Sequence, residues 1–129
     1  MLCHCGSLIP YISCCEPYLL KKEFPTTAEQ LMRSRYTAFC RLDSEYLQDT
    51  VSGPAKQAFC SEITPHHWVG LEILKTSKGT AQDRVGSVEF KAYFMEHNKR
   101  QVLHEISQFK QIKGTWYYVG GDVLGPLLH

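Results

Sequence analysis

The chain has 129 residues and a mass of 14.8 kDa, enough for one hydrophobic core but too little for two independent ones. Hydrophobic residues make up 43% of the chain and charged residues 21%, a composition that excludes disordered and collagen-like proteins. No apolar run reaches the roughly 18 residues of a membrane span. The formal net charge of +1 provides no strongly basic surface, which argues against nucleic acid as a partner.

The first twenty residues do not have the pattern of a signal peptide. They lack a basic start, and Pro10, Glu16 and Pro17 interrupt the apolar residues. We therefore expect a cytoplasmic protein, in which thiols stay reduced. Clustered cysteines in that compartment favour a metal site over a disulfide framework.

Four cysteines in this segment have the spacing of a zinc site. A C-x-C pair is followed after eight residues by an adjacent pair, Cys3, Cys5, Cys14 and Cys15. Zn²⁺ prefers four thiolate or imidazole ligands in a tetrahedron, and Gly6 allows a sharp turn after the first pair. His4 lies between two ligands, so we expect its side chain to point away. The alternative interpretation is that these cysteines are small hydrophobic core residues.

Helices are expected first. A threonine before Ala28, with Glu or Gln three positions on, predicts a helix start, and apolar residues at helical spacing continue it over residues 28–42. Asp43 is expected to cap a second, short helix that continues to Thr50. A third helix over residues 55–60 is ambiguous.

Strands follow. Alternating β-branched and aromatic residues predict strands over residues 68–76, 85–96, 101–112 and 115–120, joined by turn-like segments. Gly120-Gly121 is expected to end the last of them. Helices before strands favour an α+β fold with the helices on one face of an antiparallel sheet.

These segments resemble a known family. The N-terminal cysteines with Gly6-Ser7 are similar to the SEC-C zinc motif, and the body is similar to the YchJ family of uncharacterised proteins. The body motifs are Leu31-Met32-Arg33-Ser34-Arg35-Tyr36, Gly86-x-Val88-x-Phe90-x-Ala92, Leu103-x-Glu105-x-Ser107-x-Phe109 and Trp116-Tyr117-Tyr118. The resemblance implies a SEC-C motif over residues 1–20 and, over residues 21–129, a domain like nuclear transport factor 2 (NTF2) or cystatin, with a curved sheet and a long helix forming a cone.

The resemblance also implies that Cys3, Cys5, Cys14 and Cys15 bind Zn²⁺. Four sulfur ligands leave no open position for zinc catalysis. Two departures stand out: His4 replaces the usual proline, and Leu8-Ile9-Pro10 replaces a lysine-rich loop, which argues against contacts with acidic partners.

A pocket is expected where two charged residues point toward the core. Glu105 shares one strand face with apolar residues, and Arg35 lies on the inward side of the long helix. We therefore expect an Arg35–Glu105 contact. It is either a structural ion pair or the polar floor of a ligand cavity at the open end of the cone, with wall residues Tyr36, Ser107, Trp116 and Tyr118.

The remaining histidines and cysteines offer no catalytic pattern. His104 is expected on the opposite strand face from Glu105, and His66-His67 on the surface. Cys40 and Cys60 are expected to be buried small hydrophobic residues.

The sequence thus favours a non-enzymatic protein-interaction module with a structural zinc. Its contact surface is expected to consist of Leu8, Ile9, Tyr11 and Tyr18. The rival hypothesis is a small-molecule binder or enzyme that uses the cone. A homodimer through the exposed sheet face is a further possibility.

Overall fold

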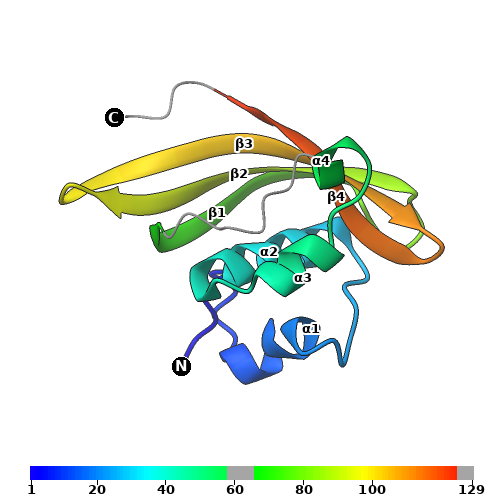
Figure 1. Cartoon of the computed structure of the whole chain (residues 1–129), viewed down its shortest axis with the longest axis horizontal. Coiled ribbons are helices and arrows are strands. Elements are labelled where there is room, and N and C mark those ends of the chain that lie inside the picture. Colours follow the sequence, from blue (N-terminus) through cyan, green and yellow to red (C-terminus); the bar gives the residue numbers. More distant parts are fainter. Residues whose placement is uncertain (58–65, 125–129) are drawn as a thin grey trace.

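One curved antiparallel sheet and one long helix form most of the fold (Figure 1). The computed structural model describes residues 1–57 and 66–124. Its elements are η1 (Tyr11–Ser13), α1 (Glu16–Leu19), α2 (Ala28–Arg41), α3 (Ser44–Asp49), α4 (Pro54–Gln57), β1 (His67–Lys78), β2 (Val85–Glu96), β3 (Lys99–Ile112) and β4 (Thr115–Val123). Helices α2 and α3 lie on one face of the sheet, and the N-terminal segment lies beyond them. The predicted α+β fold is confirmed.

Helix α2 begins and ends close to its predicted bounds. The hydroxyl of Thr27 accepts a hydrogen bond from the Gln30 N–H at 3.1 Å, which caps the first turn. Leu42 then adopts a left-handed conformation with φ 56° and ends the helix. Asp43 caps α3 as expected, accepting from the Tyr46 N–H at 3.0 Å.

The third predicted helix is present in part. Helix α4 covers Pro54–Gln57. The remainder of the predicted range, together with Cys60, lies outside the described residues.

The strands pair in chain order, β1-β2-β3-β4, through successive hairpins. Three strands are longer than predicted. In particular, β4 continues through Gly120 and Gly121 to Val123, so the prediction that these glycines end the strand is wrong. A register shift between Gln108 and Phe109 of β3 lets the pairing continue past them.

The core lies between α2 and the inner face of the sheet. Every second residue of β2 is buried there, including Val88, Phe90 and Ala92. The buried cysteines of the N-terminal segment belong to the same contiguous cluster of buried residues. Within the described ranges, no helix is both long and apolar enough to cross a membrane.

Candidate functional site

Four cysteine sulfurs meet in one cluster beside α2. The Sγ atoms of Cys3, Cys5, Cys14 and Cys15 all lie within 4.8 Å of one another. The Cys5–Cys14 and Cys14–Cys15 sulfur distances are 3.6 and 4.0 Å. A tetrahedral ion with metal–sulfur bonds of about 2.3 Å requires neighbouring sulfurs about 3.8 Å apart. The observed spacing therefore fits a single tetrahedral metal ion.

A tight turn of the chain brings the two cysteine pairs together. Gly6, at φ +80°, reverses the chain after the first pair, and a Cβ at this position would lie 3.1 Å from the carbonyl oxygen of Leu71 in β1. The Cys3 N–H then donates to the Ile9 carbonyl oxygen at 2.8 Å. The segment doubles back, and η1 carries the second pair onto the first.

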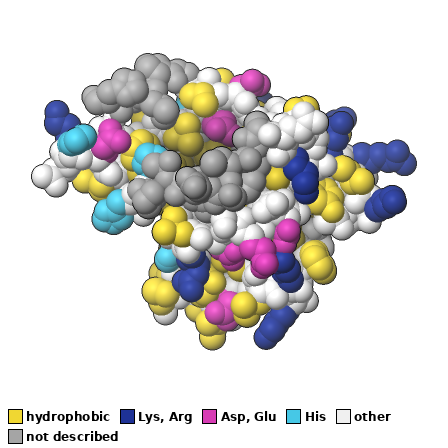
Figure 2. Space-filling model, in the orientation of Figure 1, with side chains coloured by type: hydrophobic (Ala, Val, Ile, Leu, Met, Phe, Trp, Pro, Cys, Tyr) yellow, Lys and Arg dark blue, Asp and Glu magenta, His cyan; other side chains and the backbone are white. Residues whose placement is uncertain are grey.

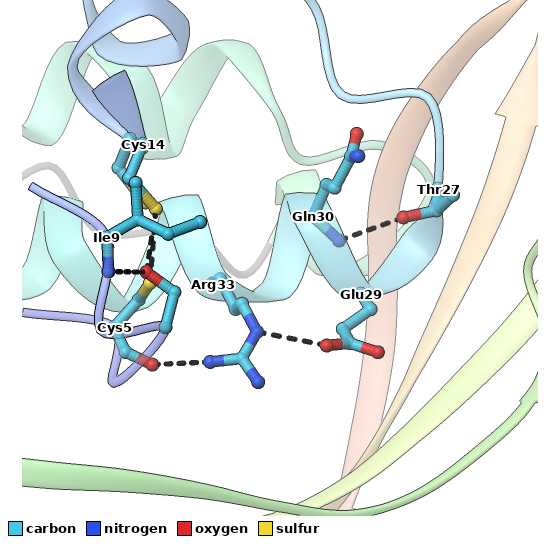
Figure 3. A network of polar contacts seen from close by, with 9 residues as sticks. Cys5, Ile9, Cys14, Thr27, Glu29, Gln30 and Arg33 are labelled. Carbon is cyan, nitrogen blue, oxygen red and sulfur yellow. Dashed lines mark hydrogen bonds and ion pairs between the residues drawn. The ribbon is translucent and has the colours of Figure 1, made fainter. Parts of the chain in front are cut away.

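Polar groups lie close to the cysteine cluster, and Figure 3 shows those beside Cys5 and Cys14. The Ser7 hydroxyl lies 3.1 Å from the Cys14 sulfur, and the Thr37 hydroxyl 3.6 Å from the Cys3 sulfur. Arg33 of α2 donates to the Cys5 carbonyl oxygen at 2.6 Å. A Zn²⁺ ion with four thiolates carries a net charge of −2, so hydroxyl donors and a nearby guanidinium suit it electrostatically.

The closeness of the thiols changes their pKa values. The interaction between the Cys5 and Cys15 thiols lowers the pKa of Cys5 to about 4 and raises the pKa of Cys15. Burial raises the pKa of Cys14 to about 11. A divalent cation would replace the thiol protons, because it stabilises thiolates directly. The donor set therefore fits zinc.

Sequence reasoning missed the residues around the sulfurs. Ser7, Arg33 and Thr37 received no role from spacing. The glycine and serine directly after Cys5 were a usable signal for Ser7, since they belong to the motif itself. His4, as expected, stays outside the sulfur cluster; it lines a surface groove with Tyr36, Cys40 and His66.

A second feature is a cavity of about 150 Å³ between α2 and the inner face of the sheet. Its polar lining consists of Arg35, Tyr36, Glu105, Ser107 and Tyr118. Its apolar lining consists of Met32, Phe39, Trp68, Phe90, Ala92 and Leu103. The structure therefore brings together five of the six residues expected around a pocket.

Trp116 is the exception, and its predicted place in the cavity wall is wrong. Its side chain is buried, and the indole N–H donates to the Thr26 carbonyl oxygen at 3.1 Å. Trp116 and Tyr118 are two residues apart in β4, which places them about 7 Å apart along one face of the strand. Trp116 therefore reaches the chain before α2, while Tyr118 reaches the cavity.

Arg35 and Glu105 line the same cavity without forming an ion pair in the described ranges. The predicted contact is therefore wrong. Arg35 is only 6% exposed, and its Nη1 donates to the Leu47 carbonyl oxygen at 2.9 Å and to the Thr50 hydroxyl at 2.7 Å. The carboxylate of Glu105 accepts from the Ser107 hydroxyl at 2.8 Å. Burial lowers the pKa of Arg35 to about 10 and raises the pKa of Glu105.

His104 lies on the other side of the sheet from Glu105, as predicted. Its Nε2 is 2.7 Å from a carboxylate oxygen of Glu89. His104 and Glu105, although adjacent in sequence, therefore do not act as one acid–base pair.

The expected apolar contact surface needs two corrections, at Tyr11 and at Tyr18, which is half-buried and packs against the core. Leu8 is 76% exposed and Ile9 is exposed, but Tyr11 is buried as part of the core cluster, with the Arg41 guanidinium over its ring at 4.5 Å. Ile12, at 68% exposure, takes its place on the surface. Figure 2 shows hydrophobic side chains at this end of the molecule, beside intermixed acidic and basic residues over the helices.

Comparison with known proteins places the chain in a family. A family described as "YchJ, middle NTF2-like domain" matches residues 27–121, which include α2 and most of the sheet. The chain belongs to the YchJ family. The UPF0225 protein GSU1048 of Geobacter sulfurreducens is 36% identical over 130 residues, covering 97% of this chain and 81% of that protein. The UPF0225 protein Ent638_2310 of Enterobacter sp. strain 638 is 40% identical over 126 residues, covering 93% and 82%.

Solved structures agree with the YchJ assignment. RPA3114, a SEC-C motif containing protein from Rhodopseudomonas palustris, has a TM-score of 0.86 and 31% identity, covering 97% of this chain and all of that one. A SEC-C motif containing protein from Psychrobacter arcticus has a TM-score of 0.81 and 28% identity, covering 99% and 85%. The predicted N-terminal cysteine motif followed by an NTF2-like domain is thus confirmed as the fold.

Proposed function

We propose that Cys3, Cys5, Cys14 and Cys15 bind one structural Zn²⁺, which holds the cysteine knuckle, residues 1–20, against the NTF2-like body. The observation that carries this proposal is the position of four sulfurs within 4.8 Å of one another. Four sulfur ligands complete the tetrahedron, so the metal is structural. Thiolate ligands require a reducing compartment, in keeping with a cytoplasmic protein.

We further propose that the knuckle presents a protein-interaction surface. The zinc-bound turn holds Leu8, Ile9 and Ile12 outward, and all three are exposed. Clustered exposed apolar side chains are typical of contact surfaces, because solvent contact costs them free energy that a partner removes. A function as a non-enzymatic interaction module follows.

The metal is tested with purified protein. Wild type should contain one zinc per chain, and the Cys14→Ser/Cys15→Ser variant should contain none. Cys40→Ser is the matched control, because Cys40 is a cysteine outside the sulfur cluster and should leave the zinc content unchanged. A wild-type protein without zinc after purification and reconstitution under reducing conditions would refute the site.

The surface is tested separately in variants that keep the metal. Leu8→Ser/Ile12→Ser should retain one zinc and lose proteins captured by cross-linking to wild type. Val123→Ser is the matched control, because this β4 residue is an equally apolar, 53% exposed side chain away from the knuckle. Equal capture by both variants would refute the contact surface while leaving the zinc site intact.

A further inference from the structure

Two charged side chains line the cavity and have complementary atoms that form no hydrogen bond within the described part of the chain. Arg35 uses Nη1 for α3, while its Nε and Nη2 form no hydrogen bond with the described residues. Glu105 uses Oε2 for Ser107, while its Oε1 forms none within the same ranges. Because both side chains line the cavity, free donors and a free acceptor face one space.

A glycine in the neighbouring strand β4 supports this placement of the carboxylate. Gly121 in β4 pairs with Ser107, and a Cβ at this glycine would lie 2.4 Å from Glu105 Oε2. A side chain at position 121 would therefore displace the carboxylate. The missing side chain leaves the carboxylate room beside the cavity.

Charge balance limits what the cavity can hold. The charges of the Arg35 guanidinium and the Glu105 carboxylate sum to zero. Burial raises the pKa of Tyr36 and of Tyr118, so both phenols stay neutral. A charged ligand would leave a net charge among apolar walls, which costs free energy. A neutral group that both accepts and donates hydrogen bonds suits the pair better.

The size of the cavity limits the ligand further. An apolar cavity of about 150 Å³ accommodates one benzene ring. The cavity here has the same volume, and its apolar lining from α2, β1, β2 and β3 includes the aromatic rings of Phe39, Trp68 and Phe90. These walls suit one planar ring.

We propose that this cavity binds a small neutral molecule with one ring and an amide, whose carbonyl oxygen accepts from Arg35 and whose N–H donates to Glu105. The ring lies against the aromatic walls. This site is independent of the proposed zinc knuckle.

The test uses the full zinc-loaded chain and benzamide as the probe, with binding followed by the indole N–H signal of Trp68. Benzoate, benzylamine and toluene are the matched ligands, with a negative charge, a positive charge and no polar group. Benzamide should bind at least about tenfold more tightly than each of them, since two hydrogen bonds to charged partners distinguish it. Absent binding of benzamide, equal binding of toluene, or tighter binding of either charged ligand would overturn the proposal.

Variants then locate the ligand. Glu105→Met removes the acceptor at similar size and should weaken benzamide binding about tenfold without weakening toluene. Glu105→Gln keeps an oxygen acceptor and should largely restore benzamide binding. Glu89→Met is the matched control, because Glu89 lies on the outer face of the sheet beside His104. Benzamide binding that Glu105→Met does not change would also overturn the proposal.

Discussion

Removing the metal should unfold the cysteine knuckle while the NTF2-like body stays folded. Three of the four cysteines are buried, and their sulfurs contact one another within 4.8 Å. Without an ion, the knuckle depends on a few backbone hydrogen bonds, such as the bond from Cys3 N–H to the Ile9 carbonyl oxygen at 2.8 Å. The body keeps α2 and the four paired strands, whose backbone hydrogen bonds lie within the helix and the sheet, and loses only side-chain bonds to the knuckle such as the one from Arg33 to the Cys5 carbonyl oxygen.

The size of the effect follows from linkage. Structural zinc sites in small peptides bind with about 10–16 kcal/mol, so free zinc is readily held far above the dissociation constant. At about a thousand times that constant, binding stabilises the closed knuckle by about 4 kcal/mol. Amides that exchange only when the knuckle opens should then exchange about a thousandfold faster after chelation.

The assay is amide hydrogen exchange with and without a zinc chelator under reducing conditions. Cys3 and Tyr11 report the knuckle, because their N–H groups donate to the Ile9 and Met1 carbonyl oxygens. Phe90, in the central strand β2, reports the body. Unchanged exchange at Cys3 and Tyr11, or equal acceleration at Phe90, would refute the reasoning.

Two further predictions concern the body. Burial raises the pKa of Glu105, so the folded protein holds this proton more tightly than the unfolded chain and loses stability as pH rises from the unfolded pKa through the folded one. The melting temperature of Glu105→Gln should therefore lie a few degrees above that of wild type at about pH 8, and the difference should vanish at about pH 4. An equal difference at both pH values would contradict the raised pKa of Glu105. Gly79→Ala and Gly114→Ala share left-handed backbone, at φ +80° and +83°, but only at Gly79 would the new Cβ meet another atom, the Cβ of Ala28 at 2.8 Å. Both should lose about 1 kcal/mol in urea unfolding from backbone strain, and Gly79→Ala about 1–3 kcal/mol more; equal losses would exclude the clash.

The secondary structure was predictable because its signals are local. Thr27 caps α2 from the adjacent position, and alternation along β2 matches its buried face residue by residue. Glycines near the end of β4 were misinterpreted because their role is not local. Gly121 leaves room for a carboxylate of β3, a contact between strands that no pattern within β4 reveals.

The clustering of the four cysteines was predictable, but the exposed surface of the knuckle was not. Cysteine spacing alone indicates a tetrahedral set, since two close pairs on one turn supply four sulfurs. Which aromatic residue points outward depends on tertiary packing. Tyr11 is buried in the core cluster and contacts Arg41 at the end of α2, and Ile12 is exposed instead. Residues thirty positions apart decide this outcome.

Arg35 shows why opposite charge is an incomplete guide to buried pairs. Helical spacing correctly predicts that this residue points inward, and a buried guanidinium needs acceptors. The C-terminal end of α3 provides them, through the Leu47 carbonyl oxygen and the Thr50 hydroxyl. Carbonyl groups at a helix end carry partial negative charge, so they satisfy a cation as a carboxylate would. Nη1 of the guanidinium bonds to the end of α3, while its other donors and Oε1 of Glu105 bond to none of the residues that the structure describes, so these atoms can serve the molecule proposed for the cavity.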